Sequence, residues 1–189
     1  MKQLSIMVDL DRCIGCKTCI VACRNHHGLL DHETSMPGEM ANYLRVESEL
    51  KGAYPKLSED FWVVMCQHCK KPPCVKACEN GAIRKDVQTG IVLIDQAKCA
   101  GARKCIEKCP YQVIQFDQAG NFAHKCDLCH GRVIHGLPPV CVEVCLAEAL
   151  SFGEKEILLM HAEAKGKKVL RKKSAQSIIY VKSGGRRTR

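Results

Sequence analysis

The spacing of the cysteines constrains this chain more than any other feature. The 189 residues include 15 cysteines, which fall into four groups, and each group ends in two cysteines separated by three residues. The groups are Cys13, Cys16, Cys19 and Cys23; Cys66, Cys69, Cys74 and Cys78; Cys99, Cys105 and Cys109; and Cys126, Cys129, Cys141 and Cys145. A spacing that recurs four times is an internal repeat, so the fold must satisfy the same chemical requirement four times.

Bound metal explains these cysteines better than disulfides do. Their number is odd, most gaps are two or three residues, and the opening segment MKQLSIMVDLDRC has neither an apolar signal region nor a twin arginine. Disulfides belong mainly to exported proteins, so we expect metal ligands in a reducing compartment. No stretch approaches the roughly 20 apolar residues of a membrane span, and we expect none.

The spacing within group one favours an iron–sulfur cluster. Three cysteines at two-residue gaps let one tight loop direct three sulfurs at a cuboidal cluster, while the cysteine after the three-residue gap points to a second cluster, as in two-cluster ferredoxins. Four groups then form two pairs. The segment 80–98 between groups two and three has the pattern of a strand, a turn and a strand. We therefore expect groups two and three to pair inside and groups one and four to pair across the outside.

This pairing predicts four sites. They are Cys13, Cys16, Cys19 and Cys145 (first); Cys66, Cys69, Cys74 and Cys109 (second); Cys78, Cys99 and Cys105 (third); and Cys126, Cys129, Cys141 and Cys23 (fourth). The third site is one ligand short because Ala102 stands where a cysteine is expected. A methyl group holds no iron, so this site is expected to hold a 3Fe–4S cluster, to hold zinc or to be empty, beside three 4Fe–4S clusters.

Two alternatives follow from zinc and from charge. The cysteines of groups two and four alone suit structural zinc, although such sites do not need the compact loop of group one. The formal charge is +9, but residues 154–189 hold 11 Lys/Arg against 3 Asp/Glu, which leaves 18 against 17 elsewhere. A zinc-dependent nucleic-acid module using this basic tail is therefore an alternative, whereas the leading interpretation includes no nucleic acid.

The sequence resembles the four-cluster ferredoxin-like iron–sulfur subunits of Mo/W-bis-pterin oxidoreductases, of the dimethyl sulfoxide and polysulfide reductase type or the tungsten aldehyde oxidoreductase and benzoyl-CoA reductase type. The matching segments are MVDLDRCIGCKTCIVAC (7–23), CQHCKKPPCVKACENGAI (66–83), CIEKCPYQVIQF (105–116), KCDLCHGRV (125–133) and PVCVEVCLAEALSFG (139–153). In some family members a residue other than cysteine at the Ala102 position gives a three-iron cluster.

The resemblance implies an α+β fold of two interleaved bacterial dicluster-ferredoxin modules, loop-rich with short strands and helices. The expected domains are an outer module (1–23 and 124–153), an insertion (24–65), an inner module (66–123) and a basic C-terminal extension (154–189). In the insertion, YLRVE (43–47) and FWVVM (61–65) are predicted strands. The extension predicts a helix over 154–165, a strand over 177–182 and a mobile end, either packed on the body or forming a docking arm for an acidic partner.

The implied function is electron transfer without catalysis. We find no nucleotide, flavin or pterin motif and no nucleophile–base set in the sequence. The expected partner is a large Mo/W-pterin catalytic subunit, with a further redox partner or a membrane-anchor subunit in addition. A stand-alone polyferredoxin-type carrier for a hydrogenase or carbon monoxide dehydrogenase is the alternative. We expect an anaerobic setting and the cytoplasm, with export alongside a signal-bearing partner as the alternative.

Overall fold

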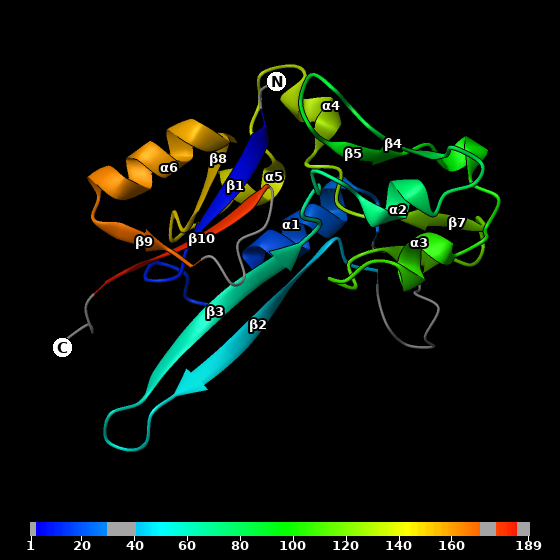
Figure 1. The fold of residues 1–189 in the computed structure, drawn as a ribbon. Helices are drawn as coiled ribbons and strands as arrows, with labels where there is room; N and C mark the ends of the chain where they lie inside the picture. Colours follow the sequence, from blue (N-terminus) through cyan, green and yellow to red (C-terminus); the bar gives the residue numbers. More distant parts are fainter. Residues whose placement is uncertain (1–2, 30–40, 171–176, 185–189) are drawn as a thin grey trace.

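The protein has the predicted α+β character, with short helices, small separate sheets and many loops (Figure 1). The computed structural model describes residues 3–29, 41–170 and 177–184. The strands are β1 (Leu4–Asp9), β2 (Leu44–Lys51), β3 (Ser58–Met65), β4 (Ile83–Lys85), β5 (Val92–Ile94), β6 (Gln115–Asp117), β7 (Phe122–His124), β8 (Leu150–Glu154), β9 (Lys167–Val169) and β10 (Ile178–Ser183). The helices are α1 (Thr18–His26), α2 (Pro73–Lys76), the 3-10 turn η1 (Gln96–Lys98), α3 (Lys104–Glu107), α4 (His130–Val133), α5 (Val140–Glu143) and α6 (Lys155–Ala164).

One four-stranded sheet joins the two ends of the chain. Its strand order is β8–β1–β10–β9, with β1 parallel to β10 and the other neighbours antiparallel. Alternate side chains of a strand point to opposite faces of a sheet. In this sheet each face packs against a different part of the molecule. Ile6 of β1 and Tyr180 of β10 enter the main core, whereas Met7 and Ile179 face α6.

The C-terminal segments are integral to this sheet. Helix α6 buries Leu158 and Ala162 against the sheet, one helical turn apart, and leaves Met160 exposed. The Nζ atom of Lys167 lies 2.7 Å from a carboxylate oxygen of Asp11 and so joins β9 to the loop after β1. Burial opposes ionisation of Asp11, but hydrogen bonds from Lys167 and Ser183 outweigh it and lower the pKa of Asp11 to about 2. In its described residues, the C-terminal extension is therefore packed on the body of the protein, which is the first of the two arrangements expected from the sequence.

The hairpin β2–β3 projects from the body (Figure 1). Its base enters the main core through Leu44 and Met65, both nearly inaccessible to solvent. Its far end is apolar and exposed: the side chains of Leu50, Tyr54 and Leu57 are 66%, 90% and 51% exposed. The hairpin thus belongs to the body at one end and reaches away from it at the other.

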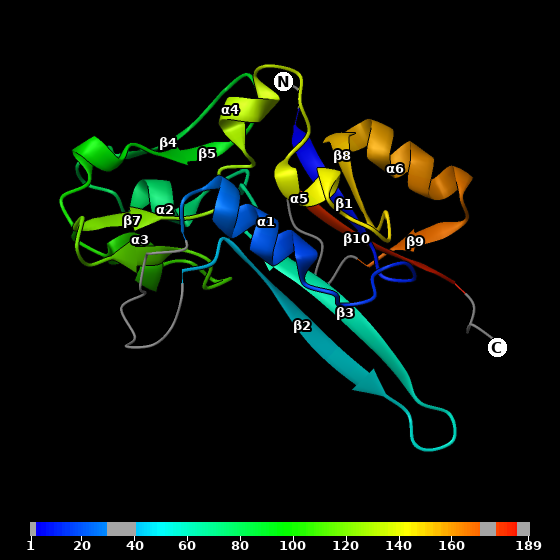
Figure 2. The same ribbon diagram turned by 180° about the vertical axis from the view of Figure 1, so that it is seen from behind.

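A second, smaller core lies beside the short hairpins β4–β5 and β6–β7. It contains apolar side chains from both hairpins, among them Val92 and Phe116, together with cysteines of α2 and α3. Seen from behind, α1 lies next to α5, and α2 and α3 gather with β7 on the other side (Figure 2). Among the described helices, none has the length and apolar character to cross a membrane.

The local sequence predictions are confirmed. The strand–turn–strand pattern over 80–98 is the hairpin β4–β5, FWVVM lies in β3, and YLRVE lies in β2 except for Tyr43, which directly precedes it. The predicted C-terminal helix and strand are α6 and β10. Residues 30–40 of the predicted insertion, and residues 185–189 of the end predicted to be mobile, lie outside the described residues.

Candidate metal centres

The cysteines gather into four sets of neighbouring thiols. All 15 lie in the described part of the chain, and none of them forms a disulfide there. The structure brings them together in the combinations predicted from their spacing. The surroundings of each combination decide what it can hold.

The first set lines one cavity, where the loop before α1 meets the loop after α5. Its members are Cys13, Cys16, Cys19 and Cys145. Burial raises the pKa of Cys19 to about 11, and the thiols of Cys13, Cys145 and Cys16 act in the same direction. Val46 and Val63 of the hairpin β2–β3 line the same cavity, so the base of the hairpin covers this set.

The second set lines another cavity, between the end of β3 and the loop after α3. It consists of Cys66, Cys69, Cys74 and Cys109. Burial raises the pKa of Cys74 to about 11; Cys66 adds to this rise, whereas the Lys125 ammonium opposes it. Tyr111 and Val92 also line this cavity.

The fourth set is the most deeply buried. Cys23 of α1 lies with Cys126, Cys129 and Cys141, and each is at most 8% exposed. Burial raises the pKa of Cys141 to about 12 and the pKa of Cys129 to about 11. The Nε2 atom of His27 lies 3.5 Å from the sulfur of Cys129.

The third set contains only three thiols. Cys78, Cys99 and Cys105 lie together in the smaller core. Burial raises the pKa of Cys105, and the thiols of Cys99 and Cys78 add to this effect. The backbone N–H of Ala123 donates to the sulfur of Cys99 over 3.4 Å.

The loop 99–105 has the backbone of the loop 13–19. Gly15 and Gly101 have φ angles of 69° and 71°, and Lys17 and Arg103 have φ angles of 62° and 56°. Both glycines occupy the left-handed region, which residues with a Cβ atom adopt only at a cost. In each loop a short left-handed turn therefore precedes a helix, at the same place relative to the cysteines.

Ala102 consequently takes the place that Cys16 has in the first loop. Both positions are exposed to solvent. Next to Ala102, the guanidinium of Arg103 lies 3.9 Å from the centre of the Phe116 ring. The structure thus presents three buried or half-buried thiols and an exposed methyl group where the other sets have a fourth thiol.

The four sets form a row. Cys19 of the first set and Cys23 of the fourth lie one helical turn apart on α1. Cys126 of the fourth set is near enough to Cys66 of the second for their charges to interact. The second and third sets share the smaller core, in which α2 contacts α3. The order along the row is first, fourth, second and third.

Backbone amides point at several of these sulfurs. The N–H of Leu128 donates to Cys126 over 3.4 Å, and the N–H of Ala149 donates to Cys145 over 3.3 Å. Such donors stabilise a thiolate and raise the reduction potential of a cluster bound to it. These donors come from backbone N–H groups within a few residues of the cysteine, that is, from the ligand loops themselves.

The donor sets fit iron–sulfur clusters. Thiolates are the ligands that iron–sulfur clusters require, and each set gathers three or four sulfurs. Burial disfavours the free thiolate at Cys19, Cys74 and Cys141. A bound metal reverses this penalty because it replaces the proton on each sulfur. The exposed methyl of Ala102 limits the third set to three sulfur ligands from the chain.

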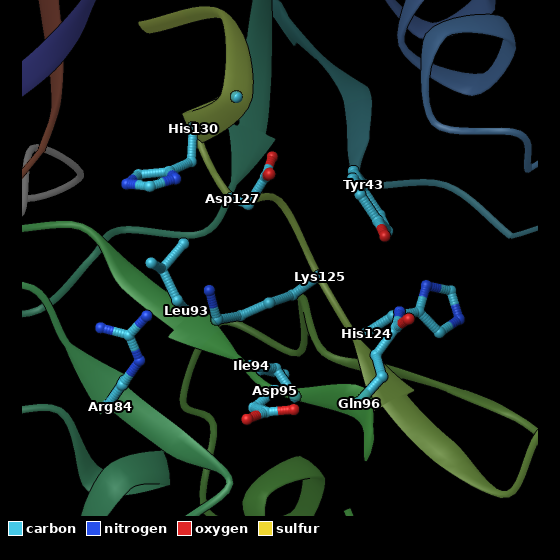
Figure 3. A pocket seen from close by; sticks show the side chains of 11 residues that line it. Tyr43, Arg84, Leu93, Ile94, Asp95, Gln96, His124, Lys125, Asp127 and His130 are labelled. Carbon is cyan, nitrogen blue, oxygen red and sulfur yellow. The ribbon is translucent and has the colours of Figure 1, made fainter. Parts of the chain in front are cut away.

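One cavity outside these sets has a different character. Its volume is about 320 Å³, and its lining includes the charged side chains of Arg84, Asp95, Lys125 and Asp127, together with His130 (Figure 3). The side chain of Lys125 runs along it toward Leu93 (Figure 3). No cysteine lines this cavity.

Two residues near the sets were not expected from the sequence. They are Tyr43, whose ring lies 4.7 Å from that of His27, and Lys125. His27 follows the first group in the sequence, but nothing there indicated that it would face the fourth group. Lys125 had a stronger signal, because it directly precedes Cys126.

Comparison with protein families supports the chemistry of these sets. The 4Fe-4S dicluster domain family matches residues 58–155, and the 4Fe-4S binding domain family matches residues 6–26. Together these two ranges contain every cysteine of the chain.

Comparison with individual proteins finds relatives along most of the chain. It is 33% identical over 161 residues to a chain of the anaerobic dimethyl sulfoxide reductase of Haemophilus influenzae, covering 80% of this protein and 74% of the relative. It is 35% identical over 153 residues to the chain of the same name from Escherichia coli K12, covering 80% and 73%. It is also 34% identical over 169 residues to a subunit of the sulfite dehydrogenase of Allochromatium vinosum, covering 82% and 70%.

Proposed function

Because this protein belongs to the family of 4Fe–4S ferredoxin-like electron-transfer subunits of molybdenum–pterin oxidoreductases, we propose that it carries single electrons along a row of iron–sulfur clusters. The electrons pass to or from a catalytic subunit that holds a Mo- or W-pterin cofactor. The chain is not an enzyme by itself.

The observation that carries this proposal is the order of the cysteine sets. Each set adjoins the next, through Cys19 and Cys23 on α1, through Cys126 and Cys66, and through the shared smaller core. Clusters held by these sets would therefore be neighbours in a line from the first set to the third. Each bound cluster supplies a centre that accepts and gives up one electron.

We assign three 4Fe–4S clusters to the complete sets. These are Cys13, Cys16, Cys19 and Cys145; Cys66, Cys69, Cys74 and Cys109; and Cys23, Cys126, Cys129 and Cys141. We assign a 3Fe–4S cluster to Cys78, Cys99 and Cys105, since the exposed methyl of Ala102 leaves one corner without a ligand. This assignment implies two interleaved modules, because the first and fourth sets each combine cysteines from distant parts of the chain.

The protein around the sets excludes water and orients the sulfurs. The cysteines of the fourth set are buried, and the hairpin β2–β3 covers the first set. In a region of low dielectric, charges and hydrogen bonds act more strongly on a cluster than they do in water. The fold therefore sets the potential of each cluster through its burial and through N–H donors such as that of Leu128.

The exposed end of the hairpin favours a subunit over a stand-alone carrier. Leu50, Tyr54 and Leu57 are large apolar side chains gathered at a projecting tip. Apolar groups gathered on such a surface are typical of contact with another protein. The names of the relatives, which are components of reductases and dehydrogenases, support a catalytic partner at this surface.

Isolation from native extract without oxygen tests the proposal. We expect a brown protein with about 15 iron atoms per chain, that is, three four-iron clusters and one three-iron cluster, together with a large chain that contains Mo or W. About 12 iron atoms would mean that the third set is empty. A monomer with iron and no large partner would favour the stand-alone carrier. A colourless protein with zinc would contradict the function.

A further inference from the structure

Lys125 is a buried lysine between the second and fourth cysteine sets. The residue is only 4% exposed, although burying an ammonium group is costly unless it is well paired. Its Nζ donates to the backbone oxygens of Val92 and of Cys126, the latter over 3.1 Å. Neither acceptor carries a charge, so these bonds occupy two of the three N–H donors without neutralising the group.

The carboxylates on the same cavity have other partners. Asp127 lies 3.6 Å from His27, and Asp95 lies 3.4 Å from Lys98. Among the described residues, no carboxylate lies within 4.0 Å of the Lys125 Nζ. A positive charge of this kind acts on whatever lies nearby.

The hydrogen bonds of Lys125 belong to a series that links two ligand loops. The N–H of Val92 donates to Nδ1 of His68 over 3.0 Å, and His68 lies between Cys66 and Cys69. At the other end, Lys125 donates to the carbonyl of Cys126. Strand β5 thus connects the loop of the second set to that of the fourth, with Lys125 at the junction.

The groups close to Lys125 belong to these two sets. Val92, whose carbonyl accepts from Lys125, lines the cavity of the second set, and Cys126, whose carbonyl also accepts from Lys125, belongs to the fourth. A cluster gains negative charge when it is reduced, so a nearby cation stabilises the reduced form. At a buried position this attraction is screened by salt much less than it is at the surface.

We infer that the buried positive charge of Lys125 raises the reduction potentials of the second and fourth clusters relative to those of the first and third. This inference rests on the proposed function. Without this charge, the middle two stations of the row would hold an electron less readily. Their potentials are tied together, since one charge acts on both.

The test compares four forms of the full chain, loaded with clusters under anaerobic conditions. Lys125→Gln keeps a donor for the carbonyls but removes the charge, and Lys125→Arg keeps the charge. Lys98→Gln is the matched control: it removes a lysine charge from the predicted inner module (66–123), but at a side chain that is 67% exposed. For each form, iron is counted and potentials are measured by titration followed with electron paramagnetic resonance.

We expect Lys125→Gln to make two of the clusters about tenfold harder to reduce, which for one electron is about 59 mV. The other two potentials should not move, and Lys125→Arg and Lys98→Gln should match the unaltered protein.

Three results would overturn the inference while leaving the proposed function intact. They are unchanged potentials in a fully loaded Lys125→Gln protein, an equal shift of all clusters, and failure of both Lys125 variants to load, which would mean a purely structural role. An unaltered protein without iron would instead remove the proposed function, before any variant is compared.

Discussion

The loops 13–19 and 99–105 share a backbone but differ in what surrounds them. Both make the same left-handed turn at a glycine and again before a helix. The first leads into the nine-residue α1, which carries Cys19 and Cys23, whereas the second leads into the four-residue α3. The first is covered by the hairpin β2–β3, and the second lies against the turn between β6 and β7.

This comparison separates the shape of a ligand loop from its ligands. The second loop keeps its shape although Ala102 replaces a thiol. The backbone conformation of the loop therefore depends on the glycine and on the helix that follows. It does not depend on the number of thiols that the loop carries. Four changes test this statement, from the largest expected effect to the smallest.

Removal of the buried thiol at the end of each loop should have the largest effect on iron content and stability. The loss of iron should differ between the two loops. Cys19→Ser should lose about four iron atoms per chain and Cys105→Ser about three. Because cluster binding contributes to folding, the free energy of unfolding should fall by several kcal/mol in each variant. Iron analysis and anaerobic denaturation measure both effects, with Lys104→Gln as the control. An equal loss of iron from both variants would contradict the three-iron assignment.

Exchange of the single differing position should convert one loop into the other. Ala102→Cys should gain about one iron atom per chain and remove the paramagnetic signal of an oxidised three-iron cluster. Cys16→Ala should lose about one iron atom and create such a signal at the first set. The shared backbone is the reason to expect both. If neither iron content nor spectrum changes in Ala102→Cys, the equivalence of the two loops is wrong.

Substitution of Gly15 and Gly101 by alanine should reduce stability by different amounts, because different side chains pack against the two glycines. Each substitution places a Cβ atom at positive φ, which costs about 1–2 kcal/mol. At Gly15 the new atom would also lie 2.6 Å from the Phe61 ring, whereas at Gly101 it would lie 2.4 Å from the end of the flexible Asn121 side chain. We expect Gly15→Ala to be the more destabilising by about 1 kcal/mol or more. Denaturation midpoints decide the order, and the reverse order would mean that the hairpin yields more easily than the amide.

The smallest effect is expected at the left-handed residues before the helices. Arg103→Gln should lose the contact with the Phe116 ring, about 0.5–1 kcal/mol at an exposed site. Lys17→Gln is the matched change in the first loop and should alter stability less. Thermal unfolding of both loaded variants compares them. Equal shifts would show that the contact adds nothing measurable.

The sequence was most informative where chemistry fixes local spacing. The cysteine groups, the strand–turn–strand unit over 80–98, the two strands of the insertion and the helix α6 all follow from patterns within a few residues, and the structure brings the thiols together in the expected sets. That these sets hold iron in the proposed numbers stays a prediction, as does the compartment.

Long-range arrangement was beyond the sequence. Nothing in SIIYVK indicated that β10 would lie parallel to β1, because strand pairing depends on the whole sheet. The burial of Lys125 was equally hidden: its neighbours Val92 and His68 come from distant segments. A lysine is read as a surface residue unless its partners are known.

The place of β10 also bears on how the protein is made. Strand β1 is synthesised long before its parallel neighbour, which comprises residues 178–183. The nascent polypeptide therefore exposes one edge of β1 until these residues have been made. A product terminated before residue 178 would keep this open edge, which invites aggregation or proteolysis.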